Sequence, residues 1–290
     1  MNKEKILKAG KIAAEAKTFA RTIVKKNVPL LGIAEKIEAK IVELGGKPAF
    51  PVNLSIDNIA AHYTPSHEDE TLAHGLLKVD LGVHIDGWTA DTAFSVDLEG
   101  SEENKNLILA SEKALETAQR MIKEKIQLSE LGKAIQESIE HFGFSPIINL
   151  SGHEMKEYEL HAGITIPNIE DSRELILKKG LYAIEPFATT GFGKVHDGKP
   201  SGIYKLINEK NVRSPIAREI LNYIIEEYQT LPFCSRWIVK KFGAKALFGL
   251  KQLEDNQNLH HFAQLVEVSG AKVSQTENTI LISDEKIITT

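Results

Sequence analysis

Cysteine is nearly absent from this chain of 290 residues, and other features are missing as well. Cys234 stands alone, which excludes an internal disulfide framework and any zinc site built from several cysteines. No run of 18 apolar residues occurs, so the sequence predicts no membrane-spanning helix. Lys and Arg number 35 against 40 Asp and Glu, and the net charge of −5 gives no basic surface for nucleic acid or anionic lipid.

The N-terminal segment lacks the uninterrupted apolar stretch of a secretory signal peptide. Residues 1–17, MNKEKILKAGKIAAEAK, mix charged and apolar residues at the spacing of an amphipathic helix. A single cysteine is typical of proteins in a reducing compartment. We therefore expect a soluble, cytoplasmic protein with neither a membrane nor a nucleic-acid partner.

The residues that are present have the composition of an ordinary globular domain, 42% hydrophobic and 26% charged. Apolar periodicity predicts two helices in the first fifty residues, the second opened by Pro29 and ended by Gly45-Gly46. Two more helices are expected over about 102–126 and 129–142, the later one with Ser129 as its N-cap. Strands are expected over about 48–96, 146–187 and 264–283.

Residues 199–262 differ in character from the segments around them. They follow a glycine-rich stretch, and Ser214-Pro215 begins a series of short helical patterns. The sequence thus predicts one domain over 1–290 that contains a helical insertion over 199–262. Helix pairs that alternate with antiparallel hairpins indicate an α+β fold, in which helices cover a curved sheet.

The stretch 78-KVDLGVHIDGWTADTAFSV-96 predicts two strands joined by a turn at Asp86-Gly87. With these two residues as the loop, Asp80 lies opposite Ala93, and Asp91 lies opposite Gly82. Side chains alternate between the faces of a sheet, so both aspartates share one face and the other face is apolar. The two aspartates are then diagonal neighbours, about 7–8 Å apart at the backbone.

Aspartate is among the poorest strand formers, so two in one hairpin need a reason. One interpretation is that both are solvated on an exposed sheet face, although Lys or Thr would be more usual neighbours there than Gly and Ala. The other is that a cation lies between them, because two carboxylates this close repel each other. The choice depends on whether the rest of the chain supplies further ligands.

Three further segments place metal-type ligands on strand-like runs, namely 148–167, 181–191 and 273–283. The residues concerned are His153, His161, Glu185, Gln275 and Glu277. A buried glutamate is rare unless it is paired or bound to a metal. For each residue alone, however, a surface or helix-capping role stays open.

Five motifs occur together in this order: VNLSIDNIAAHYTP, KVDLGVHIDGWTADTAF, SGHEMKEYELHAG, YAIEPFATTG and QTENTILIS. In order and spacing they closely resemble those of the type II methionine aminopeptidases, members of the creatinase-like "pita-bread" metallopeptidases. The resemblance extends from about Pro48 to the C-terminus. The insertion between Glu185 and Glu277 resembles type II, and the lack of a long charged extension is similar to the compact archaeal-type forms.

The resemblance implies a role for each matched residue. It makes five residues the ligands of two divalent metal ions: Asp80, Asp91, His153, Glu185 and Glu277. Four carboxylates and one imidazole suit Mn, Fe or Co and permit Zn. It implies that His62 and His161 are substrate-binding catalytic histidines, and that Phe50 and His196 form a methionine side-chain pocket. Gln275 resembles a residue that supports the ligands.

The implied activity is removal of the initiator methionine from nascent chains whose second residue is small. The implied mechanism is attack by a hydroxide activated by two metals, with Glu185 as general base, His161 stabilising the tetrahedral intermediate and His62 contacting substrate. The expected partners are peptides with an N-terminal methionine, nascent chains and the ribosome. We expect a monomer.

Two other functions stay open. An Xaa-Pro peptidase of the same fold would share all five ligands, although VNLS…AAHYTP and the insertion favour a methionine aminopeptidase. A non-enzymatic pita-bread binding protein would typically lose metal ligands, and this chain has lost none.

The remaining histidines and the cysteine are not assigned to the site. Surface positions are expected for His67, His74, His141, His260 and His261. Cys234 is expected to be a small core residue, and His84 is left unassigned.

Overall fold

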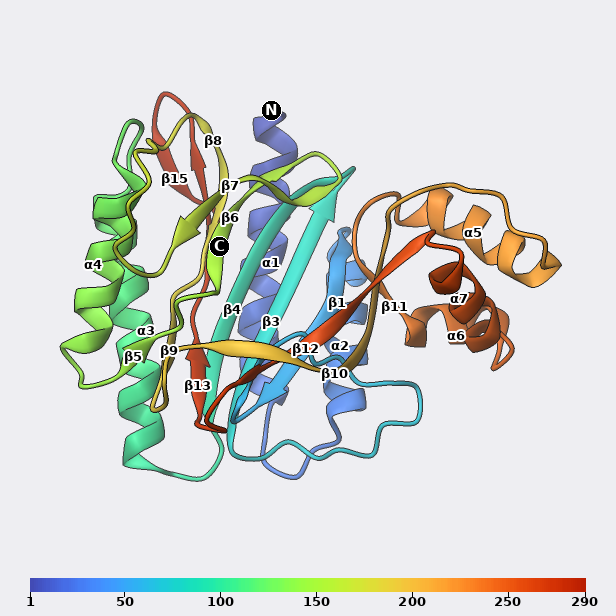
Figure 1. The fold of residues 1–290 in the computed structure, drawn as a ribbon, viewed down its shortest axis with the longest axis horizontal. Helices are drawn as coiled ribbons and strands as arrows, with labels where there is room; N and C mark the ends of the chain where they lie inside the picture. Colours follow the sequence, from blue (N-terminus) through green and yellow to red (C-terminus); the bar gives the residue numbers. More distant parts are fainter.

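Helices cover a curved set of antiparallel strands in the computed structural model, which describes residues 1–290 (Figure 1). The helices are α1 (Lys3–Ile23), α2 (Leu30–Glu43), α3 (Glu102–Met121), α4 (Leu128–Glu140), α5 (Pro215–Glu227), α6 (Ser235–Phe242) and α7 (Ala246–Asp255). The strands are β1 (Lys47–Ile56), β2 (Ile59–Ala61), β3 (Leu76–Ile85), β4 (Trp88–Asp97), β5 (Ser145–Pro146), β6 (Ser151–Lys156), β7 (Glu159–Pro167), β8 (Gly180–Ile184), β9 (Phe187–Thr189), β10 (Val195–Leu206), β11 (Phe233–Cys234), β12 (Leu259–Glu267), β13 (Val273–Gln275), β14 (Asn278–Ile282) and β15 (Lys286–Ile288). None of the helices is both long and apolar enough to span a membrane.

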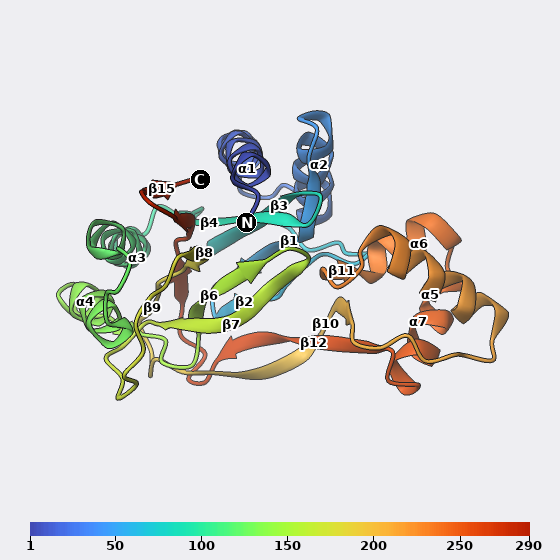
Figure 2. The ribbon, with the colours of Figure 1, turned by 90° about the horizontal axis from the view of Figure 1, so that it is seen from above.

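The strands form four antiparallel sheets that curve around one interior. Their orders are β1-β3-β4, β11-β10-β12-β2, β13-β9-β5 and β15-β14-β8-β6-β7. Figure 2 shows α1 and α2 over the first of these sheets and α3 and α4 to one side. The long β10–β12 ribbon lies on the side of the molecule opposite α1 and α2. This is the α+β arrangement with a helix-covered curved sheet that the sequence predicts.

The hairpin has the predicted register and turn. Asp86 and Gly87 both have positive φ, 47° and 82°, as a two-residue primed turn requires. Asp80 pairs with Ala93, and Gly82 pairs with Asp91. The two aspartates therefore point to the same side of the sheet.

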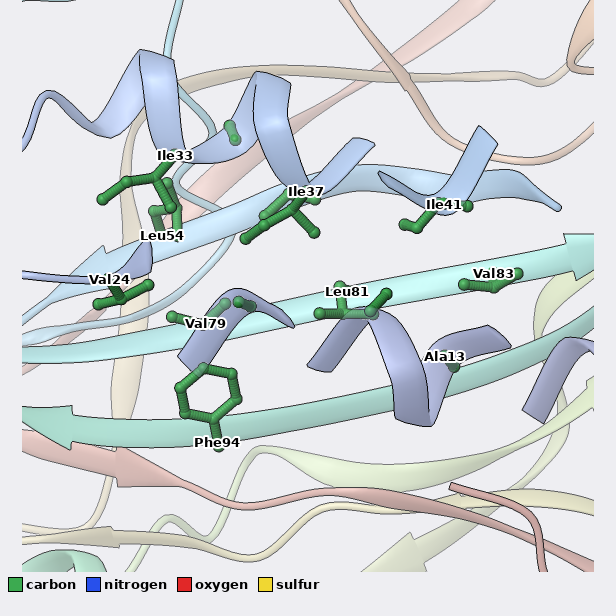
Figure 3. Packing of buried hydrophobic residues seen from close by; sticks show 14 of the residues in the cluster. Ala13, Val24, Ile33, Ile37, Ile41, Leu54, Val79, Leu81, Val83 and Phe94 are labelled. Atoms are coloured by element: carbon green, nitrogen blue, oxygen red, sulfur yellow. The ribbon is translucent and has the colours of Figure 1, made fainter. Parts of the chain in front are cut away.

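The other face of this hairpin packs against α1 and α2 (Figure 3). Ile33, Ile37 and Ile41 lie four residues apart on α2, and they are buried together with Leu81 and Phe94 of the hairpin. Burying one such side chain contributes about 1.5–3 kcal/mol. This face thus stabilises the fold and leaves the opposite one available for polar groups.

The helix boundaries between 102 and 142 differ from those expected. α3 ends at Met121, and α4 begins at Leu128 with Gln127, not Ser129, at the N-cap position. The intervening backbone makes a turn in which Lys125 has a φ of 66°, and Lys125 and Leu128 donate hydrogen bonds to the carbonyls of Leu177 and Leu175. Tertiary pairing thus overrides the helical periodicity there.

The three helices α5, α6 and α7 lie between β10 and β12 in the sequence, and they form a separate hydrophobic cluster with residues of these strands. The ends of the expected insertion, 199–206 and 259–262, are strands of the β10–β12 ribbon. In that ribbon Tyr204 stacks on His261, with ring centroids 4.1 Å apart. The expected surface position of His261 is therefore wrong in part, since its ring is largely covered by this contact.

Candidate active site

Five residues predicted as metal ligands reach one cavity from four segments of the chain. Asp80 and Asp91 come from the hairpin, His153 from β6, Glu185 from the residue after β8, and Glu277 from between β13 and β14. The segments are held together by backbone contacts, since β6 pairs with β8 and Ala93 of β4 bridges to Glu277. Pairing between strands far apart in sequence therefore assembles the site.

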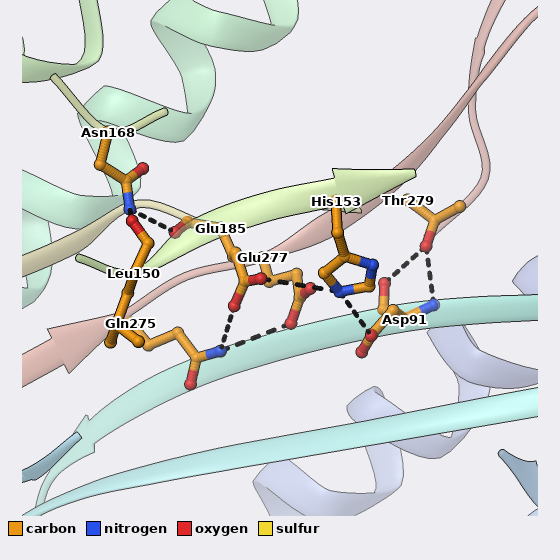
Figure 4. A network of polar contacts seen from close by, with 8 residues as sticks. All are labelled: Asp91, Leu150, His153, Asn168, Glu185, Gln275, Glu277 and Thr279. Atoms are coloured by element: carbon orange, nitrogen blue, oxygen red, sulfur yellow. Dashed lines mark hydrogen bonds and ion pairs between the residues drawn. The ribbon is translucent and has the colours of Figure 1, made fainter. Parts of the chain in front are cut away.

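Three of these residues form a tight buried group (Figure 4). One ligand atom from each of Asp91, His153 and Glu277 lies within 4.8 Å of the others. Nε2 of His153 is 3.8 Å from Oδ2 of Asp91 and 3.6 Å from Oε1 of Glu185. These distances are too long for hydrogen bonds, and they leave room for an ion between the side chains.

Burial and mutual repulsion make the ionised carboxylates costly in the absence of a cation. Burial raises the pKa of Asp80 to about 7. Burial, and then repulsion from neighbouring carboxylates, raises the pKa values of Asp91, Glu185 and Glu277 well above their usual range. Burial lowers the pKa of His153 to about 4, which keeps its imidazole neutral and able to ligate.

Unpartnered polar atoms show that this ligand set fits divalent cations. Oδ1 of Asp80, Oδ1 of Asp91 and Oε1 of Glu277 are buried and accept no hydrogen bond. Buried oxygens of this kind are normally paired or bound to a metal. Nε2 of Gln275 lies 3.4 Å from Glu185 Oε2 and 3.5 Å from Glu277 Oε2, so Gln275 contacts two of the predicted ligands.

The metal-free protein is expected to lose stability as pH rises. The pKa of Asp80 is near 7 in the folded state against 3.8 for an ordinary aspartate, so the folded chain keeps a proton that the unfolded chain releases. Stability therefore falls between about pH 4 and pH 7 and levels off above that range. Thermal unfolding of the chelator-treated protein across this range measures the slope. Asp80→Asn should flatten it, and a slope that is the same in both proteins would contradict the assignment.

The ligands line a cavity of about 310 Å³. Its other walls include Phe50, Leu160, Ile203, Phe262 and Leu265, so one side of the cavity carries the predicted ligands and the other is apolar. The Phe50 ring lies over Gly82, where an added Cβ would come within 2.2 Å of it. The glycine opposite Asp91 thus makes room for this aromatic wall. A larger groove between α2 and α6, of about 950 Å³, contains none of the predicted ligands.

His62 and His161 both line the cavity. His62 has a φ of 64°, a backbone conformation rare for residues other than glycine, and its Nδ1–H donates to the Ala263 carbonyl at 3.2 Å. Its Nε2 is then free to accept a hydrogen bond when the ring is neutral. Burial lowers the pKa of His62, so the neutral form is favoured.

His161 lies beside the predicted ligand His153, with ring centroids 4.4 Å apart. Its side chain is solvent-accessible where it lines the cavity. Desolvation by the cavity walls lowers its pKa well below the usual value, and positive charge on His153, His62 and Lys205 would lower it further. His161 is therefore a neutral imidazole able to donate one hydrogen bond into the cavity.

The structure does not bring His196 to this cavity. Its side chain is exposed, and Nδ1 lies 2.9 Å from the carbonyl oxygen of Asp197. The prediction that His196 forms part of a methionine pocket is therefore wrong, because His196 does not line the cavity. On the same strand it is Ile203 that lines the cavity, together with Leu160 and Phe262. Sequence reasoning missed these residues because apolar side chains carry no chemical signal.

Lys17 of α1 is a second residue that the sequence did not reveal. Its Nζ donates to Oγ1 of Thr92 at 2.8 Å and to Oδ1 of Asn278 at 2.9 Å. These residues directly follow the predicted ligands Asp91 and Glu277, and Thr92 also donates to the Glu277 carbonyl. Lys17 thus ties together two strands that carry ligands, and its charge opposes the rise in the pKa of Glu277.

Replacing this lysine should weaken the metal site without unfolding the chain. Lys17→Met is expected to lower affinity for Mn²⁺ by about 10- to 100-fold, the usual effect of losing a group that orients metal ligands. Calorimetric titration of the chelator-treated protein measures it. Lys11→Met, an exposed change on the same helix, is the matched control. Equal affinities of the two variants would contradict the assigned role.

Comparison with known proteins agrees with this arrangement. The chain is 44% identical over 295 residues to the methionine aminopeptidase of Pyrococcus horikoshii, which covers 100% of this chain and 99% of that protein. It is 46% identical over 288 residues to the methionine aminopeptidase of Thermococcus onnurineus, covering 98% and 97%. The corresponding protein of Methanocaldococcus jannaschii is 45% identical over 287 residues, covering 98% and 96%.

Solved structures of low sequence identity share the fold. A methionine aminopeptidase from Thermotoga maritima superposes with a TM-score of 0.72 at 23% identity, covering 100% of this chain and 98% of that one. A thermophilic Arx1 gives 0.85 at 14% identity, covering 99% and 90%. A prolidase from Pyrococcus furiosus gives 0.61 at 17% identity, covering 99% and 63%. These matches confirm the pita-bread fold. The family model described as metallopeptidase family M24 matches residues 4–257, and the chain belongs to this family.

Proposed function

We propose that this protein is a methionine aminopeptidase that removes the initiator methionine from chains whose second residue is small. The observation that carries the proposal is the cavity of about 310 Å³, with buried metal ligands on one side and an apolar wall on the other. Such a wall accommodates one flexible thioether side chain, for which an aromatic ring offers favourable contact. The relatives at 44–46% identity are themselves named methionine aminopeptidases.

The ligand set would hold two divalent ions, which lower the pKa of bound water and polarise a carbonyl. The roles of the chain's own residues are then as follows. Glu185 lies beside His153 and is the candidate general base. Neutral His161 donates a hydrogen bond toward the oxygen that gains charge, and Nε2 of His62 accepts one from the substrate backbone.

An Xaa-Pro peptidase is the alternative that the same ligands would serve. Cleavage of Met-Ala and Ala-Pro peptides, with and without added Mn²⁺ or Co²⁺, separates the two. We expect metal-dependent release of methionine from Met-Ala peptides only. Preferential cleavage of Ala-Pro would overturn the proposal, and binding of metal without cleavage of either peptide would favour a non-enzymatic role.

We further propose that the protein works as a monomer in the cytoplasm and meets its substrates at the ribosome. Initiator methionines become accessible as chains emerge, so the enzyme and the nascent chain are brought together there. Co-sedimentation with translating ribosomes tests the meeting with the ribosome, the mass in solution tests the monomer, and cell fractionation tests the cytoplasmic location.

Phe50 supplies the test of side-chain specificity. Phe50→Ala should raise KM for peptides that begin with methionine by about tenfold, because the thioether loses the ring stacked over Gly82. Metal affinity should change little, since Phe50 carries no ligand atom. Phe50→Leu, which keeps an apolar wall, is the control for packing. An equal loss for every N-terminal residue tested would show that Phe50 is only a core residue.

A further inference from the structure

The β10–β12 ribbon presents two different faces. Tyr204 and Leu206 of β10 pack with the helices α5–α7, and Leu259 of β12 joins them. Ile203 of β10 and Phe262 of β12 belong to the opposite face, and both line the active-site cavity. Because side chains alternate along a strand, the next residue of β10 on the cavity face after Ile203 is Lys205.

Lys205 lies on the cavity face of β10, two residues beyond the cavity-lining Ile203, and its ammonium group has no side-chain partner. It is directly paired with His260 of β12, whose ring meets that of Phe262 with centroids 4.6 Å apart. The side chain is half-buried and forms no ion pair or side-chain hydrogen bond within the chain. A half-buried, unpaired ammonium on the same strand face as a binding site is a group available to a ligand.

The distance between Ile203 and Lys205 matches the distance between the methionine of a substrate and its third or fourth residue. Two residues of a strand span about 7 Å, and so do two residues of an extended peptide. A methionine side chain against Ile203 therefore places the third or fourth residue of the substrate near Lys205. An anionic side chain at that position would form the ion pair that Lys205 lacks.

We propose that Lys205 gives the enzyme a preference for substrates with an acidic residue at the third or fourth position. The inference rests on the proposed function, because it concerns peptides whose methionine occupies the cavity. It adds a specificity-determining residue outside the methionine pocket and the metal ligands. Lys205 selects among substrates and takes no part in the reacting centre.

Two peptide series test this, Met-Ala-Xaa-Ser-Ser and Met-Ala-Ser-Xaa-Ser, each with Xaa as Glu, Gln or Lys. In one of them kcat/KM should rank Glu above Gln above Lys, with about two- to fivefold per step, as expected for one partly exposed ion pair. The difference should lie in KM and shrink in high salt. Lys205→Met should abolish the ranking, and Lys205→Glu should reverse it.

Lys245→Met removes the same charge from the exposed start of α7 and should keep the ranking unchanged. Hydrolysis of Met-Ala amide, which has neither a third residue nor a C-terminal carboxylate, should be the same in all variants and confirms that they are folded and loaded with metal. Equal cleavage of Glu, Gln and Lys peptides, or a ranking that survives in Lys205→Met, overturns this inference alone. Failure of the unmodified, metal-loaded protein to cleave any methionine peptide overturns the proposed function as well.

Discussion

His161→Ala is expected to lower kcat by about 10²–10⁴ while both metals stay bound. His161 touches the ligand His153, yet its neutral imidazole opens to the cavity, so its hydrogen bond is directed at substrate. If that bond strengthens only as charge develops on the scissile carbonyl oxygen, KM should change much less than kcat. Steady-state kinetics and metal analysis of the same purified sample measure the two effects together.

His153→Ala is the matched comparison, eight residues earlier and one ring contact away. Its Nε2 faces Asp91 and Glu185, so this variant should lose metal affinity first and activity as a consequence. If His161→Ala sheds metal and His153→Ala retains it, the two histidines have been assigned the wrong way round.

Asp91→Asn, like His153→Ala, should lower the metal content of the protein. Asp91 shares the tight group with His153 and Glu277, and an amide removes one of the negative charges that hold the cations together. Metal occupancy and activity should fall together by a factor of about 10² or more. The fold should survive, because the apolar face of the same hairpin packs on α1 and α2.

Circular dichroism of the metal-free variant checks the fold independently of activity. Its thermal stability should equal or exceed that of the unmodified metal-free protein, since one buried, repelling carboxyl group is gone. Two metals bound with unchanged affinity, together with full activity, would show that Asp91 is not a ligand.

Turn chemistry and the alternation of side chains were sufficient to predict the register of the β3–β4 hairpin. The Asp86-Gly87 turn sets the register, and alternation then places Asp80 and Asp91 on one face, which the structure confirms. The ligands far away in sequence could not be brought to this face by such rules. His153, Glu185 and Glu277 were found by resemblance to a family, because their meeting depends on strand pairings that no local pattern encodes.

The error at His196 has a physical cause. β10 pairs with β12 irregularly, with shifts of register between Asp197 and Pro200 and between Pro200 and Tyr204. Each shift changes which side chains face the cavity, so counting along the strand from a motif does not identify the lining residue. Lys17 was missed for a different reason, since α1 carries no feature in its sequence that points to the site.

Because the site is assembled from segments far apart in the sequence, metal binding also affects the stability of the fold. With one cysteine it has no internal disulfide, and the five ligands lie between positions 80 and 277. Ions bound by all five would cross-link segments from the first third of the chain to its last residues, as disulfides do in secreted proteins. Closing so long a loop removes much of the freedom of the unfolded chain. The catalytic centre would then also be a reversible cross-link that stabilises the fold. Chelation of the ions would destabilise the C-terminal strands before the α1–α2 core.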